Sequence, residues 1–196
     1  MPIELYQEFM GDIAKEIDRE NDIISDLLTL VKMDKTVQGL NIRQININEL
    51  LEAILKRLKP IADKKKNRGG TGKASDPFLR KIDEMKLTLA ISNLVENAIK
   101  YNRDEGWVRV SLNADHKYFY VKVMDSGIGI PEEDQAHIFE RFYRVDKSHS
   151  REIGGTGLGL AIARNAVIMH RGSIKVYSSK GEGTTFTVRI PLTYAA

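Results

Sequence analysis

The sequence predicts an α+β fold from three observations. Residues 3–31 carry apolar side chains at steps of three and four, which is the spacing of an amphipathic helix. The same spacing returns over residues 82–101 and predicts a second helix. After it, residues 108–123 and 173–190 alternate apolar and polar side chains around turn-forming residues, which is typical of β-hairpins.

The helix predicted over residues 3–31 has an apolar stripe that a single helix leaves uncovered. Its pattern is interrupted only at Glu20 and resembles the seam of a coiled coil or helical bundle. We therefore expect a partner helix, with a homodimer through residues 3–31 as one arrangement. The stripe consists of Ile3, Tyr6, Met10, Ile13, Ile17, Ile24, Leu27 and Val31.

The central helix carries a polar stripe beside its apolar face. Asn93, Asn97 and Lys100 precede apolar positions by one residue, so they lie at the border of the buried face. Asparagine costs about half a kcal/mol relative to alanine inside a helix, so two of them one turn apart indicate a ligand. Either asparagine taken alone is equally consistent with solvated surface. The apolar face is formed by Leu87, Ile91, Leu94, Ala98 and Tyr101.

Two glycine clusters follow, at residues 125–130 and 154–160. Glycine lets the backbone approach a ligand closely because it has no Cβ. The strand alternation through Phe119, Val121 and Val123 places Asp125 on the buried face at the end of a strand, where an unpaired carboxylate is costly. The exocyclic amine of adenine is a suitable donor for this carboxylate. The pattern therefore predicts a nucleotide site.

Four motifs resemble those of sensor histidine kinases, in the order and spacing of that family. Residues 93–101 resemble the asparagine box, 125–129 the first glycine box, 138–144 the phenylalanine box and 155–160 the second glycine box. The resemblance covers about residues 40–191. It implies the ATP-binding fold shared with type II topoisomerases, Hsp90 and MutL. That fold is a two-layer α/β sandwich with a mixed sheet and three main helices, preceded here by the long amphipathic helix.

The resemblance also implies roles for individual residues. Asn97 matches the ligand of Mg²⁺, Lys100 a phosphate contact and Asp125 the acceptor from adenine. Asn93 stands where related ATPases carry a water-activating glutamate, so hydrolysis should be slow. Glu96 is the carboxylate nearest to an incoming histidine, although a solvated helix position explains it equally well. The predicted catalytic residues are Asn93, Glu96 and Asn97.

The implied cofactors are ATP and Mg²⁺, and magnesium needs few ligands from the protein beyond one amide oxygen. The predicted nucleotide-binding residues are Asn93, Asn97, Lys100, Tyr101, Asp125, Gly127, Ile128, Gly129, Ile130, Phe142, Arg144, Gly155, Thr156, Gly157, Leu158, Gly159, Leu160 and Thr185.

Residues 145–153 are polar and predict a mobile lid over the nucleotide. Arg144 and Arg151 suit contact with a triphosphate, whereas ordinary surface charge is the favoured reading of Lys147. Phe139 and Phe142 are expected to pack at the hinge of this lid more than to contact the ligand.

The phosphoacceptor of the family is not found in the chain. Residues 26–33 resemble the end of the second helix of the family's dimerisation and histidine-phosphotransfer domain, and the first helix, which bears the acceptor motif, is absent. The four histidines, His116, His137, His149 and His170, lie outside such a motif. We therefore expect residues 1–38 to be a remnant of that domain and residues 39–196 to form a catalytic ATP-binding domain.

Residues 64–77 predict a flexible basic loop in place of a strand, which leaves one edge of the sheet in doubt. An engineered linker and a variant loop fit equally well. Gly72 and Lys73 hint at a P-loop, but Asn67 and Ala74 break that motif.

Composition limits the remaining choices. The 196 residues are 42% hydrophobic and carry a net charge of +3, much of it in the 64–77 loop, which argues against nucleic-acid binding. The chain has no cysteine and no apolar run near 18 residues, and its first residues do not predict a signal peptide. We expect a cytoplasmic fragment whose parent protein is anchored at the membrane.

The function that the resemblance implies is transfer of the ATP γ-phosphoryl to a histidine of a phosphotransfer domain and onward to a response regulator. Two alternatives stay open. One is a serine/threonine kinase of the anti-sigma type, which normally lacks a helix like residues 3–31. The other is a nucleotide-dependent binding module without transfer activity.

Overall fold

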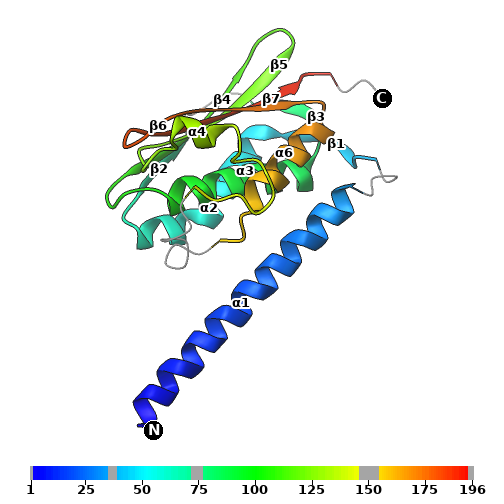
Figure 1. Cartoon of the computed structure of the whole chain (residues 1–196). Helices are drawn as coiled ribbons and strands as arrows, with labels where there is room; N and C mark the ends of the chain where they lie inside the picture. Colours follow the sequence, from blue (N-terminus) through cyan, green and yellow to red (C-terminus); the bar gives the residue numbers. More distant parts are fainter. Residues whose placement is uncertain (1, 35–38, 72–76, 146–154, 194–196) are drawn as a thin grey trace.

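The computed structural model describes residues 2–34, 39–71, 77–145 and 155–193. A long helix, α1, projects from a two-layer body in which three helices cover one face of a sheet (Figure 1). This arrangement confirms the predicted sandwich of three main helices and a mixed sheet preceded by a long helix. The helices are α1 (Ile3–Asp34), α2 (Ile47–Lys64), α3 (Glu84–Lys100) and α6 (Gly159–Met169), with a short α4 (Glu132–Gln135).

The main sheet has five strands in the order β2-β4-β5-β7-β6. β2 is parallel to β4 and the other neighbours are antiparallel, with Val108 opposite Asp125 and Asp125 opposite Thr184. A separate antiparallel pair joins β1 (Ile42–Asn46) to β3 (Leu79–Asp83). The strands of the main sheet are β2 (Arg68–Thr71), β4 (Trp107–Ala114), β5 (Tyr118–Asp125), β6 (Ser173–Ser179) and β7 (Gly183–Pro191).

The prediction of a loop without a strand over residues 64–77 is wrong at residues 68–71. These residues form β2, which pairs with β4 in register from Arg68 opposite Trp107. The central residues Gly69 and Gly70 have no side chains that could alternate, so the strand leaves no pattern in the sequence. Pairing with β4 needs only backbone groups, and it completes the edge of the sheet.

The core lies between the sheet and the three helices. The inward faces of β5 and β7 meet the apolar face of α3 and the inner face of α6, and the C-terminal turns of α1 join the same core through Leu30 and Met33. The predicted central helix, both hairpins and the helix after the second glycine cluster are therefore confirmed. Core residues of these elements include Leu87, Ile91, Leu94, Ala98, Phe119, Val121, Val123, Ala163, Val167, Phe186, Val188 and Ile190.

The remainder of α1 leaves its apolar stripe exposed and extends away from the body (Figure 1). Exposed side chains of this stripe include Ile3, Tyr6, Met10, Ile13, Ile17, Ile24 and Val31. In the described ranges, every helix is too short or too polar to cross a lipid bilayer.

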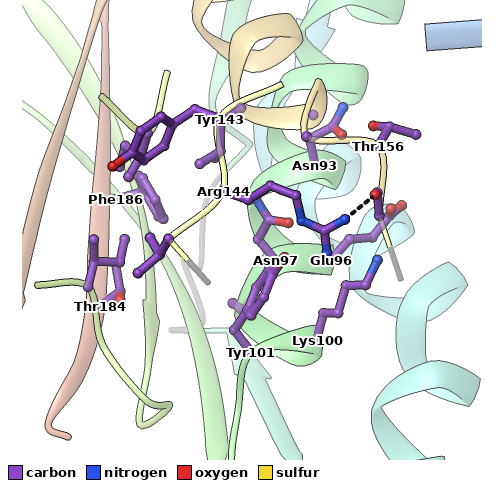
Figure 2. Close-up of a pocket in the computed structure, with 18 of the residues that line it drawn as sticks. Asn93, Glu96, Asn97, Lys100, Tyr101, Tyr143, Arg144, Thr156, Thr184 and Phe186 are labelled. Atoms are coloured by element: carbon purple, nitrogen blue, oxygen red, sulfur yellow. Dashed lines mark hydrogen bonds between the residues drawn. The ribbon is translucent and has the colours of Figure 1, made fainter. Parts of the chain in front are cut away.

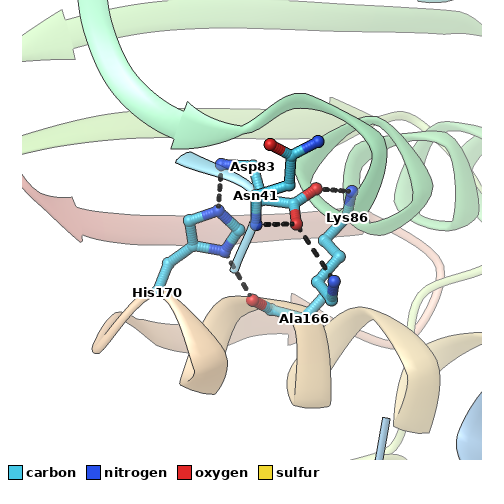
Figure 3. Close-up of polar contacts among 5 residues, drawn as sticks. All are labelled: Asn41, Asp83, Lys86, Ala166 and His170. Carbon is cyan, nitrogen blue, oxygen red and sulfur yellow. Dashed lines mark hydrogen bonds and ion pairs between the residues drawn. The ribbon is translucent and has the colours of Figure 1, made fainter. Parts of the chain in front are cut away.

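His170 ends α6 and joins it to β3 (Figure 3). Its Nε2 accepts a hydrogen bond from the backbone N–H of Asp83 at 3.0 Å, so Nδ1 carries the proton and donates to the Ala166 carbonyl at 2.7 Å. The ring is 3% exposed, and this burial lowers its pKa. Asp83 caps α3 through Lys86 N–H at 3.0 Å. Burial acts to raise the pKa of Asp83, but hydrogen bonds from Lys86 and Asn41 lower it on balance.

The neutral state of His170 predicts a pH-dependent stability. Because its pKa is lower in the folded chain, its contribution is complete above the unfolded value of about 6.5 and is lost as pH falls below it. Between about pH 7 and about pH 5.5, the wild-type protein should lose up to about 1 kcal/mol more unfolding free energy than His170→Gln. Urea denaturation at both pH values measures this.

Other titrating groups are shared by the two proteins and cancel in the comparison. His116→Gln is the matched control, because it replaces an exposed histidine that lies outside these contacts. An equal loss in the wild type and His170→Gln would show that the ring does not stay neutral in the fold.

Candidate nucleotide site

A cavity of about 670 Å³ lies at the C-terminal half of α3. Its walls come from α3, the loop after β5, the segment of residues 138–145, the second glycine cluster, β7 and one face of α1. Figure 2 shows Asn93, Asn97 and Tyr101 along α3, with Thr184 and Phe186 across the cavity from β7. The structure brings together most predicted site residues: Asn93, Glu96, Asn97, Lys100, Tyr101, Asp125, Ile128, Gly129, Ile130, Arg144, Gly155, Thr156, Gly157, Gly159 and Leu160.

The amides of α3 are oriented by their helix. The Nδ2 of Asn93 donates to the Leu89 carbonyl one turn earlier, at 2.9 Å, which leaves its oxygen on the side of the second glycine cluster. Asn97 lies one turn further along and also lines the cavity. Among the described residues, none forms a hydrogen bond with the Asn97 amide, so its oxygen is available to a ligand.

Two cations meet near the second glycine cluster. Arg144 donates from Nη1 to the Gly155 carbonyl at 2.9 Å, and a Cβ on Gly155 would come within 3.0 Å of the Lys100 ammonium. Burial lowers the pKa of Lys100, and the charge of Arg144 lowers it further, whereas Glu96 and Asp22 act in the opposite direction. Two like charges held together and partly desolvated favour an anionic ligand.

Glu96 lies at the edge of the same region. Partial desolvation raises its pKa, and Arg57 and Lys100 act to lower it while Asp26 raises it. The residue is exposed to solvent, so its carboxylate is accessible to an incoming proton donor.

Asp125 ends β5 and lines the same cavity as these cations. Its Oδ1 accepts from the backbone N–H groups of Gly127 at 2.8 Å and Thr184 at 3.2 Å. Within the described parts of the chain, no group donates to Oδ2, so this oxygen is open to a ligand. Burial raises the pKa of this carboxyl to about 6, although both backbone hydrogen bonds act to lower it. A group that donates to Oδ2 would repay this cost of burial.

Two glycines make these approaches possible. A Cβ on Gly127 would lie 2.4 Å from the Tyr101 carbonyl, so only glycine lets the loop after Asp125 reach the end of α3. A Cβ on Gly159 would lie 2.6 Å from Oδ1 of Asn93. Gly159 therefore lets the N-terminus of α6, with the backbone N–H groups of its first turn, lie against the polar stripe of α3.

Four predicted residues do not line the cavity. Gly127 acts through its backbone and Leu158 is fully buried before α6. Phe142 is 55% exposed, and its N–H donates to the Gly157 carbonyl at 2.9 Å. It therefore supports the turn at residues 155–157, here called the glycine turn, from outside the cavity. Thr185 is on the other face of β7, because Thr184 pairs with Asp125 and points inward.

Several lining residues were not predicted. Thr184 and Phe186 follow from the alternation of β7, since the buried positions Val188 and Ile190 share their face. Tyr143 lines the cavity, and its hydroxyl donates to Asp134. Asp22, Ser25 and Asp26 come from α1, and nothing in their local sequence signals this contact. The remaining lining residues that the prediction lacked are Ala98, Ile138 and Val145.

The predicted lid lies almost entirely outside the described residues. Val145 lines the cavity, but residues 146–153, with Lys147 and Arg151, are not described.

Comparison with known proteins identifies the family. Residues 82–194 match the family described as "Histidine kinase-, DNA gyrase B-, and HSP90-like ATPase". The chain is 36% identical over 185 residues to sensor histidine kinase WalK of Bacillus subtilis strain 168, which covers 93% of this chain and 30% of WalK. It thus spans under a third of that relative.

Solved structures agree with this assignment. The nucleotide-free catalytic domain of histidine kinase ThkA matches with a TM-score of 0.69 and 26% identity, over 79% of this chain and all of that one. ThkA in complex with the response regulator protein TrrA matches in fold with a TM-score of 0.78 and 23% identity, over 98% of this chain and 53% of that one. With the amide stripe, the buried aspartate and both glycine clusters around one cavity, this chain belongs to the sensor histidine kinases and comprises their ATP-binding catalytic domain.

Proposed function

We propose that this chain binds Mg-ATP and transfers its γ-phosphoryl to a histidine of a separate phosphotransfer domain, from which it passes to a response regulator. One observation carries the proposal: a single cavity joins an adenine-type acceptor, Asp125, to a pair of partly desolvated cations, Lys100 and Arg144. A ligand that satisfies both needs an amine-bearing base and a polyanionic tail.

The base is assigned to the Asp125 end of the cavity. Oδ2 of Asp125 accepts from the exocyclic amine of adenine, and Ile128, Ile130 and Phe186 supply apolar contacts to the ring. The backbone bonds to Oδ1 keep the carboxylate from rotating away. A base without a donor at this position would leave the carboxylate unpaired, which costs roughly 1–3 kcal/mol.

The phosphates are assigned to the end that holds Lys100, Arg144 and the N-terminus of α6. The cations and the backbone N–H groups in the first turn of α6 all favour negative charge. We propose that Asn97 would hold Mg²⁺. Its side-chain amide oxygen lines the cavity and has no hydrogen-bonding partner among the described residues. When bound, magnesium would offset charge on the phosphate oxygens.

The residues around the phosphates favour transfer over hydrolysis. Asn93 is an amide and cannot take a proton from water, whereas an imidazole nucleophile needs no strong base. Glu96 is the carboxylate that could receive the proton of an incoming histidine, and its raised pKa supports this role. We therefore propose Asn93, Glu96 and Asn97 as the catalytic group.

The partners proposed are a histidine-phosphotransfer domain and a response regulator. The solved complex of ThkA with TrrA supports the second of these by analogy of fold. The exposed apolar stripe of α1 supports a homodimer through residues 3–31, and we propose that residues 1–38 belong to the dimerisation domain and 39–196 to the catalytic domain. We propose a cytoplasmic position for this domain, in a parent protein anchored at the membrane, with no nucleic-acid ligand.

A first prediction concerns the pH dependence of nucleotide binding. With a pKa of about 6, Asp125 is mostly protonated at about pH 5 and mostly ionised at about pH 7. Because the amine of adenine favours the ionised form, ADP affinity should fall about tenfold as the pH is lowered from about 7 to about 5. Calorimetric titration at both pH values measures it.

Asp125→Asn is the matched control, because it keeps the shape of the side chain and removes its titration. Its ADP affinity should be lower at about pH 7 and should change much less with pH, apart from the titration of ADP itself. Identical pH profiles for the two proteins would remove Asp125 from the base site.

A second prediction tests the transfer itself. With γ-labelled ATP and Mg²⁺, the chain should not label itself, because its histidines lie outside an acceptor motif. It should label a supplied histidine-bearing helix domain from a related kinase, and Asn97→Ala should abolish this. Gel analysis after acid and base treatment identifies the product, since phosphohistidine is labile in acid and stable in base.

The same experiment separates the alternatives. Labelling of serine or threonine on a partner would support a kinase of the anti-sigma type. Tight ATP binding without labelling of any histidine domain would indicate a nucleotide-dependent binding module. Labelling of His149 or His170 in the chain itself would show that its own histidines act as acceptors.

A further inference from the structure

Helix α1 contributes a wall to the nucleotide cavity. Its last turns are anchored in the core, where Leu30 is fully buried and Met33 is 7% exposed, and it packs against α6. One to two turns before this anchor, Asp22, Ser25 and Asp26 line the cavity. In Figure 1 the N-terminal part of α1 extends away from the body, so only this short segment meets the site.

One hydrogen bond ties α1 to the second glycine cluster. The hydroxyl of Thr156 donates to Oδ2 of Asp26 at 2.6 Å, across 130 residues of sequence. The same hydroxyl accepts from the backbone N–H of Leu158 at 3.1 Å. Thr156 lies between Gly155 and Gly157, which both have positive φ, at 129° and 73°. Asp26 therefore holds the side chain at the centre of the glycine turn.

The charge of α1 acts on the groups that would receive phosphate. The carboxylate of Asp22 stabilises the ammonium of Lys100, and Asp26 acts on Glu96. A polyphosphate tail at Lys100 would share the cavity with both carboxylates of α1. Like charges in a partly desolvated site repel more strongly than in water.

We propose, resting on the function proposed above, that Asp22 and Asp26 form a charge-sensitive clamp in which α1 and the nucleotide's phosphate tail compete for the glycine turn and Lys100. Asp26 is a positioning residue that acts through Thr156. Asp22 screens Lys100 in the clamped state. The more negative charge a nucleotide carries at this end, the more strongly it opposes the clamp.

Two consequences follow from this competition. Docking of α1 weakens the binding of ATP more than that of ADP. It leaves the binding of adenosine unchanged, because adenosine has no phosphate. By linkage, ATP weakens the docking of α1 by the same factor. The part of α1 that carries Asp22 and Asp26 is thereby sensitive to whether a triphosphate is bound.

The test compares ATP, ADP and adenosine affinities in the wild type, Asp22→Asn and Asp26→Asn by calorimetric titration at low salt. Asparagine at 26 keeps an acceptor for Thr156 and removes only the charge. ATP affinity should rise about threefold or more in each variant, ADP less, and adenosine not at all. The gain should shrink at high ionic strength because salt screens exposed charges.

Asp18→Asn is the matched control, because it removes the same charge from an exposed position of α1 that does not line the cavity. Its affinities should equal those of the wild type. An unchanged or weaker ATP affinity in Asp22→Asn and Asp26→Asn, or an equal gain for adenosine, would overturn the clamp. If the wild-type chain binds neither ATP nor ADP, the nucleotide site itself fails, which is a distinct outcome.

Discussion

The site depends on the way helix α3 is held between the sheet and the cavity. Its buried face, with Leu94, Val95 and Ala98, is packed in the core, and the polar stripe begins at the border of that face. Both ends of the helix are bound: Asp83 caps the first turn, and Nζ of Lys65 donates to the Lys100 carbonyl at 2.5 Å. A rotation of α3 that moved its amides would also expose its apolar face, so the core fixes the geometry of the stripe.

A second constraint comes from the alternation of strands β5 and β7. Asp125 and Thr184 are paired on the same inward face, at the point where the core residues of both strands end. This puts a carboxylate in a partly apolar setting with two backbone donors on one oxygen and, among the residues that the structure describes, none on the other. Burial raises its pKa, and the ligand amine that we propose would offset that cost. The proposed recognition of the base would then follow from the position at which the strand ends.

The sequence predicted those parts of the fold whose side chains report their surroundings. The three-and-four spacing located α3, the alternation located both hairpins, and the position of Asp125 followed from the same period of two. The strand β2 could not be predicted because Gly69 and Gly70 have no side chains, so only the backbone of β4 reveals it. Thr185 was assigned from a motif, whereas the alternation through Phe186 points to Thr184, and the local period was the better guide.

The contribution of α1 to the cavity was also beyond the sequence. Its periodicity indicates only an apolar stripe. An aspartate such as Asp26 is equally common at solvated helix positions, so the residue type does not predict this contact. The bond to Thr156 forms because Leu30 and Met33 anchor the helix in a core built from residues far along the chain. Contacts of this kind depend on the assembled fold and leave no local pattern.

Asp125 is proposed to accept a hydrogen bond from the amine of adenine inside this cavity. The most direct test is a thermodynamic cycle with Mg-ATP and its analogue that lacks the exocyclic amine, each titrated against the wild type and Asp125→Ala. In the wild type, loss of the amine should weaken binding about tenfold, whereas in Asp125→Ala the two nucleotides should bind equally. An equal loss in both proteins would show that another group contacts the amine, and would contradict the assignment of the site.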